Sequence, residues 1–221
     1  MIITHRYFAR FFLVKVLQLH NLCYQLAGLL SQRVEPDNLH PKHRLMDYHD
    51  WFARRLNKDW HVLDIGCGNG ALAFDIKAAC RTVTGIDINA ANIETAQKKY
   101  SKQGISYICS DVLTHRFNQH FQAVILSNVL EHIDNRVAFL KQLYANQSQA
   151  DPPVLLLRVP MMTRDWITLY KKELGIEWRL DPSHFTEYTL DQVSKEMEAA
   201  GLQIESFDVQ FGEFYGVAKK I

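Results

Sequence analysis

The sequence predicts an α/β fold in which helices cover both faces of a doubly wound, Rossmann-like parallel sheet. Short apolar runs such as Val62–Ile65 and Val154–Val159 are typical of strands buried in a parallel sheet. Segments with apolar residues at helical spacing lie between these runs. The first run continues into Gly66, Gly68 and Gly70, so a strand, a glycine-rich turn and a helix follow one another.

The glycine-rich turn helps to identify the ligand. Glycines let a chain turn sharply and approach a ligand closely, and the free N–H groups of the following helix face the turn. The spacing G-x-G-x-G differs from the G-x-G-x-x-G of dinucleotide sites. The carboxylate of Asp64 precedes the turn, where it would repel a pyrophosphate but suit an ammonium group. The alternative is that these glycines serve only a tight turn.

Three further segments follow in order. The strand predicted over 83–88 ends near Asp87, which could accept hydrogen bonds from both hydroxyls of a ribose; the alternative is a solvated aspartate or a helix cap. The run 105–111 ends in Asp111, and the run 121–133 is apolar before Glu131 and His132.

Together the four segments resemble the class I S-adenosylmethionine-dependent methyltransferases of small-molecule type, over roughly residues 59–221. The resemblance implies a seven-stranded sheet with an antiparallel final strand, and S-adenosylmethionine as cofactor. It places Asp111 against the adenine and the 121–133 backbone beside the methionine part. Arg44 could pair with the cofactor carboxylate, or it could be a solvated surface arginine. The expected cofactor-binding residues are Asp64, Gly66, Cys67, Gly68, Gly70, Asp87, Ile88, Asp111, Val112, Ser127, Asn128 and Arg44.

Two histidines are candidate catalytic residues. His184 lies after the fifth predicted strand, where the resemblance puts a histidine facing the acceptor, and His132 follows the fourth. A histidine titrates near neutral pH and so suits a general base. The alternative is a structural role for both, and this is the favoured interpretation for His132.

No metal site is predicted. Glu131, His132 and His184 resemble part of the metal site of small-RNA 3′-terminal methyltransferases. Asn128 stands where those enzymes have a further glutamate, and the formal net charge of +1 shows no basic surplus for nucleic acid. The expected partner is therefore a small-molecule acceptor, such as a sugar or a biosynthetic intermediate, methylated on a hydroxyl or amine. The rival hypothesis is a non-catalytic cofactor-binding or regulatory protein on the same fold.

Residues 1–58 are expected to form an N-terminal helical extension, and residues 59–221 the core. Residues 1–30 are apolar and basic, without the uninterrupted apolar stretch of a signal peptide. The first hypothesis is a helix that packs on the core or covers the site. A homodimer contact comes second, and contact with a membrane surface comes last. Four scattered cysteines are typical of a reducing compartment, so a cytoplasmic location is expected.

Overall fold

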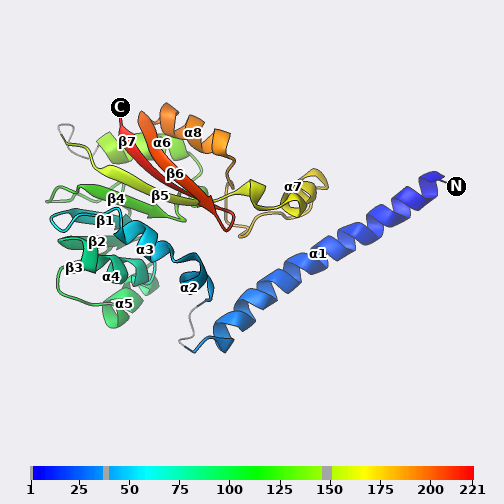
Figure 1. Cartoon of the computed structure of the whole chain (residues 1–221), viewed down its shortest axis with the longest axis horizontal. Coiled ribbons are helices and arrows are strands. Elements are labelled where there is room, and N and C mark those ends of the chain that lie inside the picture. The colour runs from blue at the N-terminus through cyan, green and yellow to red at the C-terminus, as the bar shows by residue number, and fades with distance from the viewer. Residues whose placement is uncertain (1, 37–39, 146–150) are drawn as a thin grey trace.

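A single seven-stranded sheet runs through the computed structural model, which describes residues 2–36, 40–145 and 151–221 (Figure 1). The strand order is β3-β2-β1-β4-β5-β7-β6. Neighbours are parallel from β3 to β5, and β7 is antiparallel to both β5 and β6. The predicted sheet with an antiparallel final strand is confirmed. The strands are β1 His61–Ile65, β2 Thr82–Asp87, β3 Ile105–Cys109, β4 Ala123–Ser127, β5 Val154–Pro160, β6 Leu202–Gln210 and β7 Glu213–Lys220.

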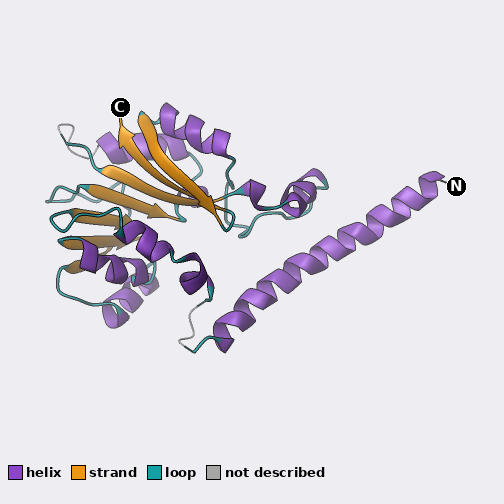
Figure 2. Ribbon diagram, in the orientation of Figure 1, coloured by secondary structure: helices purple, strands orange, loops and turns teal. Residues whose placement is uncertain are grey.

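Helices cover both faces of the sheet (Figure 2). The apolar side chains of α3 and α4 pack against one face, and those of α6 and α8 pack against the other. The central strands are apolar on both sides because both faces are covered, which explains the unbroken apolar runs of the sequence. The helices that flank the sheet are α3 Tyr48–Ala53, α4 Ala71–Ile76, α5 Ala90–Lys99, α6 Arg136–Ala145 and α8 Leu190–Ala199.

The helical segment before β1 is broken in the middle. The chain forms two short helices there, α2 (Lys42–Met46) and α3. Asp47 separates them with a left-handed backbone, at a φ of 46°. This break turns the chain, so that α2 and α3 run in different directions (Figure 1).

The N-terminal helix α1 (Ile2–Val34) extends away from the sheet (Figure 1). It meets the rest of the chain near α7 (Trp166–Glu173), where Lys171 donates to the Asn21 side chain at 2.6 Å. Leu17 is buried, whereas most of the other apolar side chains of the helix are exposed. Among the described residues, no helix combines the length and apolar character needed to cross a bilayer. The role of α1 and the boundary at residue 58 stay predictions, and residues 1 and 37–39 lie outside the described part.

Candidate functional site

The glycine-rich loop joins β1 to α4 at the carboxyl edge of the sheet. The backbone N–H groups of Gly66 and Cys67 both donate to the carbonyl of Ile86 in β2, at 2.8 and 3.2 Å. Gly66 has a φ of +63°, and a Cβ there would lie 2.6 Å from Cγ2 of Val129. Only glycine therefore fits, and the loop is held close to the segment that follows β4.

Asp87, at the end of β2, is fixed beside the same loop. Its carboxylate accepts hydrogen bonds from the N–H of Gly68 at 2.9 Å and from that of Asn89 at 2.8 Å. Ile88 is 77% exposed beyond it. Asp111 is exposed and accepts from the Leu113 N–H, while Val112 packs partly against the core. These residues follow β2 and β3, whose carboxyl ends lie at the same edge of the sheet.

A cleft of about 310 Å³ opens beside the loop. Its walls come from the loop, from the ends of β4 and β5, and from the segment before β1. Six of the predicted cofactor-binding residues line it, namely Asp64, Gly66, Cys67, Gly68, Ser127 and Asn128. Burial raises the pKa of the Cys67 thiol, which disfavours the reactive thiolate at this position. Gly70, Asp87, Ile88, Asp111 and Val112 lie outside this lining.

The arginine in the cleft is not the one that the sequence suggested. Arg44 is absent from the lining, and its guanidinium pairs with Glu35 at 2.9 Å with 64% of its side chain exposed. Arg158 of β5 lines the cleft instead. It is buried, pairs with Glu213 of β7 and lies over the ring of Tyr48, 3.8 Å from its centroid. A charged residue inside the apolar run 154–159 was the signal for it.

Asp64 is the least solvated charge in the cleft. Its side chain is 1% exposed, and Oδ2 has no hydrogen-bond partner. Burial raises the pKa of Asp64 from 3.8 to about 7, with a smaller contribution from the charge of Asp87. A carboxylate in this setting needs a cationic partner, because an unpaired buried charge is costly.

The two candidate catalytic histidines lie next to each other, outside the cleft lining. His132 belongs to a short 3₁₀ helix after β4, Leu130–His132, and His184 to the loop between α7 and α8. Their rings are 4.7 Å apart, nearly perpendicular. The Phe185 N–H donates to the Glu131 carbonyl at 2.8 Å, which ties the two segments together.

Glu131 lies with these histidines. It is fully buried, and neither carboxylate oxygen has a hydrogen-bond partner. Burial raises the pKa of Glu131 to about 8. Burial, and then the neighbouring His184, lower the pKa of His132, so the neutral imidazole is favoured there. The roles of His132 and His184 in catalysis stay predictions.

Known sequences resemble the chain over the segment that contains the glycine-rich loop. Residues 62–147 match the profile of a family described as "Methyltransferase domain". A ubiquinone biosynthesis O-methyltransferase of Rickettsia canadensis is 36% identical over 84 residues. That alignment covers 37% of the chain and 36% of the relative, so the match spans about a third of the relative's length. A protein of the same name from a Bradyrhizobium species is 28% identical over 174 residues, covering 70% of the chain and 67% of the relative.

Solved structures share the fold over most of the chain. A magnesium protoporphyrin IX methyltransferase of Synechocystis, solved with bound SAH, has a TM-score of 0.61 at 19% identity and aligns over 81% of the chain and 83% of its own length. An S-adenosylmethionine-dependent methyltransferase of Clostridium acetobutylicum has a TM-score of 0.61 at 13% identity, over 90% and 99% of the two chains. At these identities the likeness establishes the fold.

Proposed function

We propose that the chain transfers a methyl group from S-adenosylmethionine to a small-molecule acceptor. Residues 62–147 match a methyltransferase-domain profile, and the fold is that of solved S-adenosylmethionine-dependent methyltransferases. The observation that carries the proposal is the buried carboxylate of Asp64, whose Oδ2 has no hydrogen-bond partner, in a cleft beside the glycine-rich loop. The cofactor has an ammonium group at its amino-acid end, which is the partner that this carboxylate needs.

The charges of the cleft suit both ends of the amino-acid part of the cofactor. Asp64 would bind the ammonium group, and Arg158 and Lys42 supply positive charge for the carboxylate. Asp87, fixed beside Gly68, would accept hydrogen bonds from the ribose hydroxyls. Ile88 and Asp111 would then meet the adenine at the open end of the site.

The acceptor is proposed to be methylated on oxygen, because the two relatives described above are named ubiquinone biosynthesis O-methyltransferases. In such a transfer an oxygen lone pair forms the new bond to carbon as the bond from carbon to sulfur breaks, and the sulfonium becomes a neutral thioether. The acceptor loses its hydroxyl proton. The protein has to align the two reactants, exclude water and assist the loss of that proton.

Calorimetric titration tests the cofactor. Wild-type protein should bind S-adenosylmethionine and SAH and should ignore NADH. Asp87→Ala should lose about 1.5–3 kcal/mol of binding free energy, the usual contribution of hydrogen bonds to a charged group. Binding of NADH in place of S-adenosylmethionine would contradict the proposal.

A screen of hydroxylated small molecules for SAH release tests the transfer. Release that depends on one acceptor, with a methylated product found by mass spectrometry, supports an enzyme. Tight cofactor binding with no release for any acceptor in the screen would favour the rival hypothesis of a non-catalytic cofactor-binding protein.

A further inference from the structure

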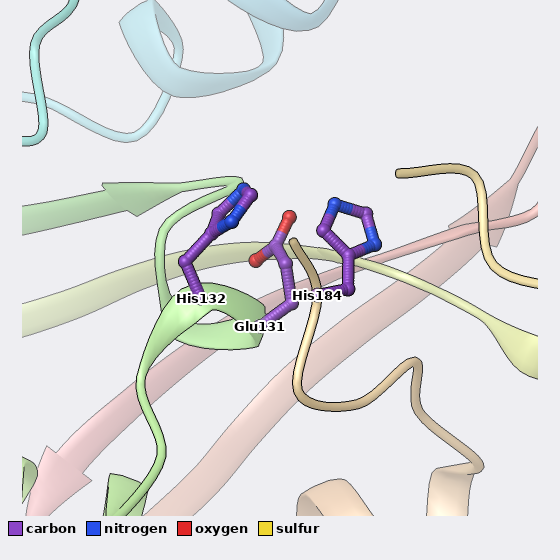
Figure 3. Close-up of side chains that lie close together, drawn as sticks. All are labelled: Glu131, His132 and His184. Atoms are coloured by element: carbon purple, nitrogen blue, oxygen red, sulfur yellow. The ribbon is translucent and has the colours of Figure 1, made fainter. Parts of the chain in front are cut away.

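Three side chains with metal-binding groups meet beside the carboxyl end of β4. Glu131 and His132 come from the 3₁₀ helix after that strand, and His184 comes from the loop before α8. One ligand atom from each residue lies within 4.8 Å of the others. Figure 3 shows the Glu131 carboxylate between the two imidazole rings, with all three groups directed to the same side.

The buried carboxylate of Glu131 gives the strongest indication that this cluster binds a ligand. It is 0% exposed, and neither oxygen has a hydrogen-bond partner in the described part of the chain. Burying such a group is expensive unless it is paired or bound to a metal. A structural carboxylate would be expected to accept hydrogen bonds from its surroundings, as Glu187 does from Arg164 and from the Leu180 N–H.

The hydrogen bonds of His184 leave one nitrogen for a ligand. Its Nδ1 lies 3.2 Å from Oε1 of Glu187, a buried carboxylate, so Nδ1 carries the proton and donates. The lone pair is then on Nε2. A histidine whose other ring nitrogen donates to a carboxylate is the usual arrangement around a protein-bound metal ion.

His132 is held in the same tautomer by hydrogen bonds that involve Ser183 and Asp181. The Ser183 hydroxyl donates to Asp181 at 2.7 Å, so its oxygen accepts from Nδ1 of His132 at 3.1 Å. The lone pair of His132 is therefore also on Nε2. Two imidazoles with the same ring nitrogen available, beside an unpaired carboxylate, form a ligand set of two nitrogens and one oxygen.

We propose that Glu131, His132 and His184 bind one divalent transition-metal ion, of the zinc class. Two imidazoles and a carboxylate suit zinc and its neighbours better than magnesium or calcium, which prefer oxygen ligands. Three protein ligands leave a coordination position open. If the proposed methyl transfer holds, an acceptor oxygen would take that position and lose its proton more readily, so His184 would act as a ligand and not as a general base.

Metal binding is tested on the full chain after removal of metals with a chelator. Calorimetry with zinc chloride should give one ion per chain, and cobalt(II) should give the visible absorption of a nitrogen- and oxygen-ligated ion. Glu131→Gln keeps the shape of the side chain and removes its charge. Because altering a group behind a ligand typically costs 10–100-fold in affinity, loss of this ligand should weaken zinc by about 100-fold or more.

Asp75→Asn is the matched control. It removes another carboxylate that pairs with a histidine, His49, outside the cluster. It should leave zinc affinity and the cobalt spectrum unchanged. Circular dichroism should show that Glu131→Gln folds, since the variant removes an unpaired buried charge. Equal zinc affinity in wild type and Glu131→Gln, or no binding by wild type, overturns the proposal.

Cofactor binding is measured on the same samples. Glu131 lies outside the cleft lining, so S-adenosylmethionine should bind equally with and without zinc. Failure of S-adenosylmethionine to bind would reject the proposed function and leave the zinc result standing. If Glu131→Gln loses zinc binding and still binds the cofactor, the metal site is separate from the cofactor site, and the proposed metal site is supported.

Discussion

Asp64→Asn should make the free protein more stable while weakening its cofactor site. The pKa of Asp64 is about 7 in the folded protein against an ordinary value of 3.8. Between these values the folded chain holds a proton that the unfolded chain has released. The free energy of unfolding therefore falls as the pH rises from about 4 to about 7. Above about pH 7, ionised Asp64 lowers it by the full amount that corresponds to the difference between the two pKa values.

The size of the effect follows from the two pKa values. Each pKa unit is worth about 1.4 kcal/mol, so the cost at high pH is about 4 kcal/mol. An asparagine side chain cannot ionise, so the variant is free of this cost at high pH. The free energy of unfolding of the variant should exceed that of wild type by an amount that grows by roughly 2.5 kcal/mol between pH 5 and pH 8.

Urea denaturation of both proteins without cofactor, at pH 5, 6, 7 and 8, measures this difference. Calorimetry with S-adenosylmethionine measures the accompanying loss. Wild-type affinity should rise with pH up to about 7, because the cofactor needs the ionised carboxylate, and the variant should bind weakly at every pH. A stability difference that does not change with pH would refute the reasoning about Asp64.

Two further predictions concern the sheet and the loop. Glu213→Ala should lower the free energy of unfolding by about 3–5 kcal/mol, because it leaves the buried guanidinium of Arg158 unpaired, and adding Arg158→Met should restore part of the loss in urea denaturation. Gly66→Ala should lower the melting temperature more than Gly68→Ala does. Both glycines have a positive φ, but only a Cβ added at Gly66 would contact Val129, at 2.6 Å. Val129→Ala should therefore reduce the difference in melting temperature between the two alanine variants. Equal melting temperatures for the two glycine variants would contradict this account.

The sheet and the loop could be predicted because their signals are local. A buried parallel strand is an apolar run, and a turn with positive φ needs glycine, so both are visible within ten residues of sequence. The break at Asp47 has no such local signal, because neither glycine nor proline occupies the position with the left-handed backbone.

The charges of the site could not be predicted because they depend on distant segments. Arg158 is fixed by Glu213, 55 residues later. Glu131 could be read only as the neighbour of His132. Its burial without a partner depends on the loop around Phe185 folding over it, which no local pattern reveals.

The position of β7 in the sheet also bears on how the chain folds during synthesis. β5 pairs with β4 on one side, and its other edge is covered only by β7, which is made last of the seven strands. Until then β5 presents an open edge of apolar residues and a guanidinium with no counter-charge. We expect nascent chains that end before residue 213 to be digested by protease within β5, and chains that include β7 to resist, so the sheet becomes stable in one late step.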